Sequence, residues 1–316
     1  ASLNIAAISK KDYGLNFAFN IGLNKNEITS LGSLENLLAS TGWASTQISD
    51  DFIVNVGKSL GVMNGYVSDG RYEISDFNYD SGTGKYTLKS GVADATEIVG
   101  VLSPGMMKLK NVDGSADNKV TVKDKTVIGN ANAKHTGGMV INANAYGFDL
   151  SAAFNWSVGN DVYNANKIES TTSNENGQYR NLSTEMADGK RWTNLDPTTG
   201  TLVTDPNALA ELNANTTMWS PYMKNYVFSD WAVEDGSFLR LNMLSVGYSV
   251  PETFISKIGL TKLRFYATAN NVFIITKYSG LDPEVSTRRK TPLTPGVDYS
   301  GFPRSRQVVF GLNLNF

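Results

Sequence analysis

The chain has 316 residues, of which 41% are hydrophobic and only 18% are charged, and its formal net charge is -2. This charge balance gives no reason to expect a nucleic-acid partner. The chain contains no cysteine and a single histidine, His135, which excludes disulfides, thiolate metal sites and an imidazole zinc cluster.

Asparagine occurs 32 times and glycine 29 times, and both residues favour turns over helix interiors. The apolar runs are too short for a membrane-spanning helix, which needs about 20 apolar residues. An all-β fold is therefore expected. The sequence opens at Ala1 without the basic and apolar stretches of a secretory signal, so we expect any such signal to lie upstream.

Seven segments alternate between apolar and small or polar residues, the pattern of a strand whose two faces differ. Between Tyr13 and Asn24, for example, the odd positions are Tyr, Leu, Phe, Phe, Ile and Leu, and the even ones are Gly, Asn and Ala. The segments are about 9 to 14 residues long, which suits a tilted transmembrane strand better than the strand of about 5 to 6 residues in soluble domains. The expected strands span about 2–10, 13–24, 136–145, 146–158, 237–249, 262–271 and 306–316.

Short and long connections alternate between these strands, and the long ones span 25–135, 159–236 and 272–305. Outer-membrane barrels have short periplasmic turns and long exterior loops, whereas soluble domains, including the β-sandwich that is the alternative here, rarely carry such long connections. The pattern predicts a transmembrane antiparallel β-barrel with three exterior loops. Bacterial barrels usually have an even number of strands, at least eight, so the other strands must come from upstream sequence or another polypeptide.

Several motifs resemble the C-terminal end of SusC-like (SusC/RagA family) TonB-dependent transporters, which are outer-membrane nutrient importers of Bacteroidetes. The motifs near the C-terminus are Trp231-Ala-Val-Glu-Asp-Gly-Ser-Phe-Leu-Arg240, Leu244-Ser-Val-Gly-Tyr248, Asn270-Asn271, Thr276-Lys-Tyr-Ser-Gly-Leu-Asp-Pro-Glu284, Phe302-Pro303 and Phe310-Gly-Leu-Asn-Leu-Asn-Phe316. Upstream matches are Gly57-Lys-Ser-Leu-Gly61, Gly65-Tyr66, Asp69-Gly70, Val127-Ile-Gly-Asn130 and Gly159-Asn-Asp-Val-Tyr-Asn-Ala165. The resemblance covers most of the chain.

The resemblance implies that residues 1–316 are the C-terminal portion of a 22-stranded barrel that encloses a plug domain and lies in the bacterial outer membrane. It also implies a SusD-like surface lipoprotein as partner, pairing of two SusC–SusD units, and import of oligosaccharides or peptides driven by the TonB complex. We find no plug domain and no TonB box in this sequence, and both would precede Ala1. The alternative is a non-transporting surface barrel that acts as an adhesin or carries an enzyme in its loops.

One stretch of the first long segment has the spacing of a twelve-residue calcium loop, in which oxygen ligands come from positions 1, 3, 5, 7, 9 and 12. The expected ligands are Asp113, Ser115, Asp117, the carbonyl of Lys119, Thr121 and Asp124. Position 6 is Asn118 instead of the usual glycine, and asparagine tolerates the left-handed conformation that this turn needs. The sequence thus predicts a structural Ca²⁺ ion, and the alternative is a polar loop whose Asp, Asn and Gly residues only make turns.

No catalytic residue is expected, and the chain is not expected to be an enzyme. The carboxylate neighbours Asp50-Asp51 and Glu234-Asp235 point to opposite faces of an extended chain, and His135 has no nucleophile beside it. Aromatic residues of the long segments could contact a sugar or peptide or could instead hold the segments together, so the substrate-binding residues stay unknown. These residues are Trp43, Trp192, Trp219, Trp231, Tyr66, Tyr72, Tyr163, Tyr179, Tyr222 and Tyr299.

Overall fold

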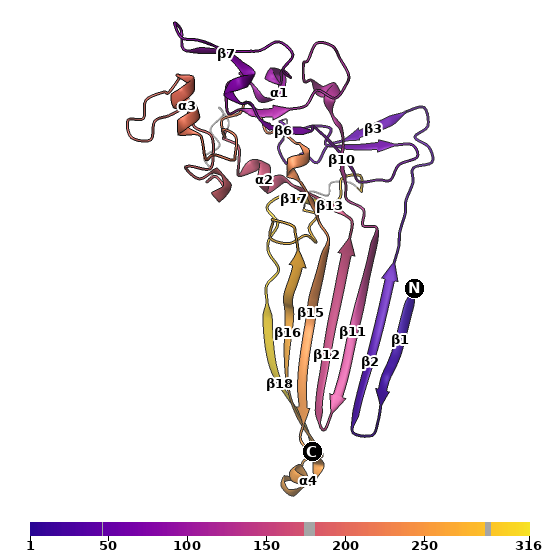
Figure 1. Ribbon diagram of the computed structural model, residues 1–316. Coiled ribbons are helices and arrows are strands. Elements are labelled where there is room, and N and C mark those ends of the chain that lie inside the picture. Colours follow the sequence, from indigo (N-terminus) through magenta and orange to yellow (C-terminus); the bar gives the residue numbers. More distant parts are fainter. Residues whose placement is uncertain (46, 174–180, 288–291) are drawn as a thin grey trace.

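The computed structural model describes residues 1–45, 47–173, 181–287 and 292–316. Its main element is a long antiparallel sheet of seven strands, which carries a compact group of smaller elements, here called the cap, at one end (Figure 1). In spatial order the sheet consists of β1 (Ser2–Ser9), β2 (Tyr13–Gly22), β11 (His135–Ala145), β12 (Phe148–Val158), β15 (Phe238–Ser249), β16 (Lys262–Thr276) and β18 (Gln307–Asn315). The outer strands β1 and β18 each have one edge without a partner among the described residues.

The short connections all lie at the end of the sheet opposite the cap (Figure 1). Tyr146 and Gly147 join β11 to β12 in two residues and both have positive φ, 48° and 90°. Such two-residue turns match the right-handed twist of the strands that they join. The connection between β15 and β16 is longer and carries α4 (Glu252–Ile255) and η5 (Ser256–Ile258).

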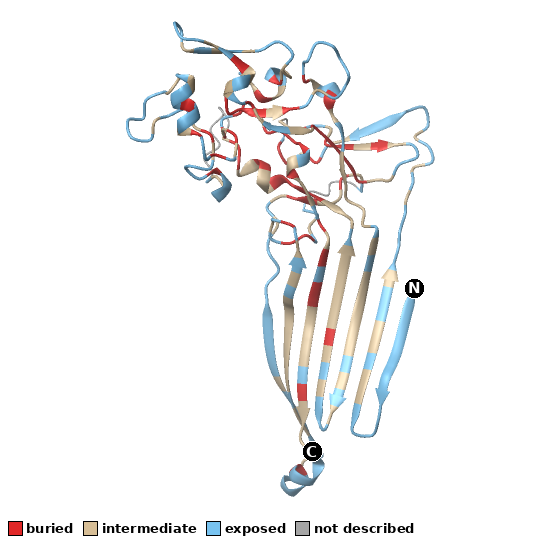
Figure 2. Cartoon of the chain, viewed as in Figure 1, coloured by how far each residue is buried: buried red, intermediate tan, exposed pale blue. Residues whose placement is uncertain are grey.

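One face of the sheet is continuously apolar because the strand register aligns the large side chains. Phe19 pairs with Met139, and Met139 in turn pairs with Phe154. At the far side of the sheet Phe265 pairs with Leu312. These side chains are not buried by any other element, as Figure 2 shows: the sheet is largely exposed or intermediate.

The opposite face of the sheet is polar. The guanidinium of Arg264 on β16 reaches across β15 to the carboxylate of Asp149 on β12, with Nη2 and Oδ1 2.6 Å apart. Gly247 of β15 makes this bridge possible, because a Cβ atom at this position would collide with both side chains. The hydroxyls of Ser245 and Thr268 share a hydrogen bond of 2.9 Å on the same face.

In their described residues, the three long segments that were expected to be exterior loops contain short strands and helices. Their strands are too short for an alternating pattern to stand out in the sequence. One sheet has the order β10-β5-β4-β3, formed by β3 (Asn36–Ala39), β4 (Phe52–Asn55), β5 (Val62–Gly65) and β10 (Thr126–Asn130). Smaller sheets pair β6 (Ser68–Arg71) with β9 (Met107–Leu109), β7 (Phe77–Asp80) with β8 (Lys85–Leu88), and β13 (Asp161–Asn164) with β14 (Val233–Asp235) and β17 (Val297–Asp298).

Short helices complete the cap. They are α1 (Thr96–Val99), α2 (Ala165–Glu169), α3 (Pro206–Leu212), η1 (Ile74–Asp76), η2 (Val122–Asp124), η3 (Thr184–Met186) and η4 (Asp230–Ala232). Asp205 begins α3 by accepting the backbone N–H groups of Asn207 and Ala208. Within the described ranges, no helix has the length and apolar character needed to cross a lipid bilayer.

The hydrophobic core of the molecule lies in the cap. One cluster is built around Tyr72, Met107 and Leu109, all of which are almost completely buried. A second cluster contains Tyr163 and Phe228, whose rings stack with centroids 3.7 Å apart. Both clusters combine residues from more than one long segment, so the cap folds as one body.

The strand expected at 262–271 is longer than the sequence indicated, because β16 continues to Thr276. Asn270 and Asn271 form an irregularity where the register of β15 and β16 shifts, and Asn271 has a positive φ of 51°. The shift changes the phase of the alternation, which is why the sequence pattern predicts the end of the strand at residue 271. The third long segment consequently begins after Thr276 and not at residue 272.

Candidate functional site

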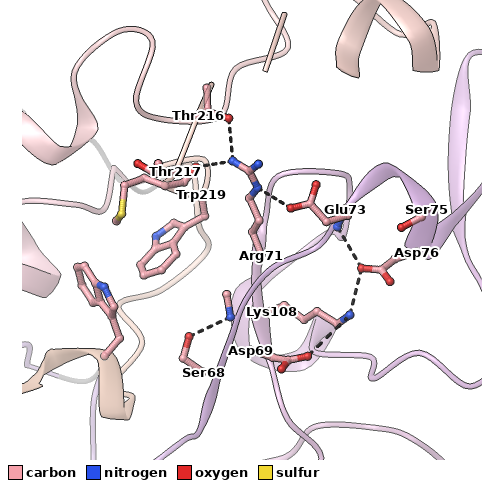
Figure 3. Close-up of a pocket in the computed structure, with 13 residues that line it drawn as sticks. Ser68, Asp69, Arg71, Glu73, Ser75, Asp76, Lys108, Thr216, Thr217 and Trp219 are labelled. Carbon is pink, nitrogen blue, oxygen red and sulfur yellow. Dashed lines mark hydrogen bonds and ion pairs between the residues drawn. The ribbon is translucent and has the colours of Figure 1, made fainter. Parts of the chain in front are cut away.

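The cap contains a pocket of about 590 Å³ whose lining combines charged side chains with tryptophans (Figure 3). Its first wall is formed by β6, η1 and the two residues between them, which together supply Asp69, Arg71, Glu73 and Asp76, and by Lys108 of β9. The facing wall consists of residues 216–219 and Trp231. The pocket therefore joins the first long segment to the second.

Arg71 connects the two walls. Its Nε lies 2.8 Å from Glu73 Oε1, while its Nη1 donates to Thr216 Oγ1 at 2.7 Å on the other side. The guanidinium also lies over the ring of Trp192, 4.7 Å from the ring centroid, as expected for a cation–π contact. These contacts use the flat shape of the guanidinium, which a lysine could not reproduce.

Lys108 is the second cation of the pocket, and two carboxylates surround it. Its Nζ lies 3.1 Å from Asp76 Oδ2 and 3.8 Å from Asp69 Oδ2. Asp76 also accepts the backbone N–H of Glu73, which begins η1. Burial of Tyr72 behind Lys108 raises the pKa of its phenol to about 12, so this group stays neutral.

Trp219 and Trp231 meet edge to face, with ring centroids 4.7 Å apart. Lys167 from α2 lies over Trp231, with Nζ 4.1 Å from the ring centroid, and is 3.4 Å from Glu234 Oε1. Burial raises the pKa of Glu234, but hydrogen bonds from Ser279, together with Lys167, outweigh that effect and leave the pKa below its usual value. These contacts anchor this side of the pocket to the second and third long segments.

The chemistry of the pocket suits a ligand without net charge. Both of its cations already have carboxylate partners within 4 Å, so a charged ligand would have to compete with existing ion pairs. Carboxylate oxygens and N–H groups together can accept and donate hydrogen bonds, which is what hydroxyl or amide groups need. An indole ring adds a surface on which C–H groups can pack.

A second cluster ties the third long segment to the end of the sheet, and it unites several of the motifs that were noted in the sequence. Arg240 of β15 is only 2% exposed and lies 2.6 Å from Asp282 and 3.0 Å from Glu284. Its Nη1 also donates to the side-chain oxygen of Asn271 at 2.6 Å. Arg304 contacts both carboxylates from the other side, at 3.4 and 3.2 Å.

The loop of the calcium prediction is closed by hydrogen bonds within the protein. Asp124 is fully buried, and its carboxylate accepts the backbone N–H groups of Val112, Asp113 and Thr121. Asn118 has a φ of 56°, the left-handed conformation that the sixth position requires.

The other expected ligands also take part in local hydrogen bonds. Asp113 accepts the N–H of Ser115, Asp117 accepts the N–H of Lys119 and the hydroxyl of Ser115, and Thr121 caps η2. The described residues contain no group of three or more Asp, Glu, His or Cys side chains that could hold a metal ion. The calcium site stays a prediction.

The neighbouring carboxylates do not face each other. Asp51 is buried and accepts both the backbone N–H and the hydroxyl of Thr41, while Asp235 accepts the N–H of Ser237. Burial raises the pKa of Asp51 above its usual value, although the Thr41 hydrogen bonds oppose this. His135 accepts a hydrogen bond of 3.2 Å from the indole of Trp156 on the neighbouring strand.

Most of the aromatic candidates stabilise the cap. Trp43 donates a hydrogen bond of 2.6 Å to the hydroxyl of Tyr163 and packs against Tyr299. Tyr222, in contrast, is 69% exposed, and Tyr179 lies outside the described residues. Sequence reasoning missed the charged lining of the pocket, because β6, η1 and β9 are far apart in the chain and each is short.

No family model matches the chain. The curated proteins that it is similar to are TonB-dependent receptors. TonB-dependent receptor P3 of Formosa agariphila is 28% identical over 319 residues, which cover all of this chain and 28% of that protein. TonB-dependent receptor SusC of Bacteroides thetaiotaomicron is 38% identical over 90 residues, which are 28% of this chain and 8% of that protein. The chain is thus similar to TonB-dependent receptors, among them SusC.

Solved structures share the fold of this SusC-like chain. A chain in the structure of the RagAB peptide transporter superposes with a TM-score of 0.66 at 22% identity, and a chain of the RagAB peptide importer in the closed-closed state with a TM-score of 0.61 at 24% identity. All of the SusC-like chain is covered, but only 28% and 29% of those chains. It likewise spans about 28% of the length of its full-length curated relative P3. The open seven-stranded sheet is therefore part of a barrel wall.

Proposed function

We propose that this SusC-like chain forms part of the wall and the exterior cap of a TonB-dependent importer in the bacterial outer membrane. The observation that carries the proposal is the sheet with one apolar face that no other described residues cover. Large side chains on this face remain exposed, such as Leu3 at 55%, Phe265 at 51% and Phe310 at 81%. Lipid is the environment in which such a face is stable.

The strand length agrees with this placement. A strand rises about 3.3 Å per residue, so the 11 residues of β12 extend about 36 Å, which is about 26 Å along the membrane normal at a tilt of about 45°. The apolar band of an outer-membrane barrel is about 25 Å tall. The short turns then face the periplasm and the cap faces the exterior.

The proposed activity is import of a nutrient, either an oligosaccharide or a peptide, driven by the TonB complex through the preceding part of the same polypeptide. The proposed partner on the exterior is a SusD-like lipoprotein, and two such pairs would assemble together. Support comes from the comparisons: one relative is named SusC, and a solved structure with the same fold is described as a peptide transporter. The pocket at Arg71 and Trp231 is the proposed contact for cargo in this chain.

Uptake of a labelled substrate by the native host tests the activity. Cells without TonB should lose uptake and growth on that substrate, because passage through a plugged barrel needs an external energy source. Uptake that persists without TonB would contradict the proposal. A surface barrel acting as an adhesin or carrying an enzyme is the alternative, and it predicts binding or turnover that does not depend on TonB.

A further inference from the structure

Strand β3 is an edge strand of the cap whose outer side pairs with no other described strand. It runs along β4 in an unbroken antiparallel register from Asn36 to Ala39. Leu37 and Leu38 are 38% and 45% exposed, and Leu34, just before the strand, is 54% exposed. The free edge is therefore both apolar and regular.

Proteins normally protect such an edge with lysine, proline, a bulge or a covering element. None of these devices is present in β3: the stretch from Leu31 to Ser40 contains one charged residue, Glu35, and no proline. The opposite edge of the same sheet is secured, because the N–H of Asn130 in β10 donates to Asp161 at 2.8 Å. This asymmetry indicates that β3 is built to pair with a further strand.

The position of β3 indicates where that strand comes from. In Figure 1, β3 lies on the side of the cap that is above β1, the strand at which the large sheet ends. All eight residues of β1 are exposed, which agrees with a wall of the proposed barrel that continues beyond this strand. Exterior connections between the next strands of the wall would rise beside β3.

We propose that β3 is extended by a strand from the exterior segments of the preceding barrel part of the same polypeptide. This inference rests on the proposed function, in which the SusC-like chain continues into the rest of the barrel, as its 28% share of relative P3 suggests. Pairing of edge strands uses backbone hydrogen bonds, and the exposed leucines would add side-chain contacts. A detachable partner fits less well, because its departure would leave the apolar edge unprotected.

Cysteine labelling on intact cells tests the proposal, and the chain itself contains no cysteine. The variants are Leu38→Cys and, as control, Val101→Cys, which replaces a cap residue that is 86% exposed. Both are made in the full-length transporter with any other cysteine removed and are treated with a membrane-impermeant maleimide. We expect Leu38→Cys to react roughly tenfold or more slowly than the control.

The same measurement in cells that lack the surface lipoprotein identifies the occupant. If Leu38→Cys stays protected without the lipoprotein, the strand that pairs with β3 belongs to the same polypeptide. If the protection disappears, the lipoprotein covers β3 and the proposal is overturned. Equal reactivity of both variants also overturns the proposal. Failure of Val101→Cys to react on intact cells would contradict the exterior location of the cap, and thus the proposed function itself.

Hydrogen exchange supplies an independent readout that no introduced side chain can disturb. In the purified full-length protein, every amide of β3 should exchange slowly, because both edges of the strand would be hydrogen-bonded. Alternation of slow and fast amides along Asn36–Ala39 would show that the outer edge is free, and would overturn the proposal.

Discussion

Replacing Arg240 by methionine should release the third long segment from the end of the sheet. Arg240 is 2% exposed and contacts Asp282, which is itself 4% exposed. Removing one partner of a buried ion pair costs about 3 to 5 kcal/mol, because the other charge stays buried without compensation. Arg304 contacts the same carboxylate at 3.4 Å and is half exposed, so the lower value of about 3 kcal/mol applies.

Hydrogen exchange of the full-length protein measures this cost locally. A loss of about 3 kcal/mol makes opening of the segment more frequent by a factor of roughly one hundred, so its amides should exchange roughly one hundred times faster. The effect should be confined to residues 277–287 and 292–306 and the adjoining ends of β15 and β16. The apolar strands below should keep their protection.

Arg264→Met is the matched control. Arg264 also pairs with a carboxylate across the sheet, but the side chain of Asp149 is 40% exposed, and such pairs contribute about 1 kcal/mol or less. The control should therefore change exchange by less than about a factor of ten. Equal effects of both variants, or unchanged exchange in Arg240→Met, would refute the account of this cluster as a buried anchor.

Further predictions concern the cap. Asp51→Asn should remove a pH dependence of the free energy of unfolding. Because burial raises the pKa of Asp51, its contribution to stability is fully present below the pKa of the unfolded chain and is lost as pH rises through the pKa of the folded protein, and denaturation of the wild type from acid to neutral pH should show this loss. Gly105→Ala should destabilise the cap and weaken cargo binding, because Gly105 has a φ of 87° and a Cβ atom there would collide with Trp192; unchanged melting would contradict this. Trp231→Ala should weaken cargo binding by about 1 kcal/mol or more in calorimetry, while Tyr222→Ala, outside the pocket lining, should not. For the calcium prediction, titration of the full-length protein with CaCl₂ should give heat that is reduced in Asp117→Asn, and absence of heat ends that prediction.

The sequence alone predicted the sheet well, because a strand with one lipid-facing side imposes a strict alternation over many residues. Between Phe148 and Val158 every second residue is large and apolar except Ala152, and the structure has a strand over this whole range. The end of β16 was predicted wrongly because Asn271 shifts the phase of that alternation. An irregularity of one residue is enough to make the alternating pattern end before the strand does.

The cap could not be predicted in the same way. Its strands have two to five residues, so no period can be recognised, and its contacts join residues far apart in the chain. Arg71 and Thr216, for example, meet across 145 positions. The ligand spacing around Asp113 and Asp124 fitted a calcium loop, but the same residue types also close a loop through backbone N–H groups, and spacing cannot distinguish the two. The sequence analysis noted the motif Leu281-Asp-Pro-Glu284 and the motif that ends at Arg240, but nothing in the sequence indicated that Arg240 pairs with Asp282 and Glu284.

The mixed origin of the cap clusters has a consequence for the order of assembly. Met63, Tyr163 and Val297 belong to one hydrophobic cluster, yet each comes from a different long segment. In the proposed outer-membrane placement, each of these segments reaches its position in the cap only when the strands that flank it have crossed the bilayer. The second cluster therefore becomes complete only when the last hairpin has been inserted, and until then Phe52, Phe228 and their neighbours lack part of their packing. A completely packed second cluster therefore requires that all the strands of this part of the wall are in place.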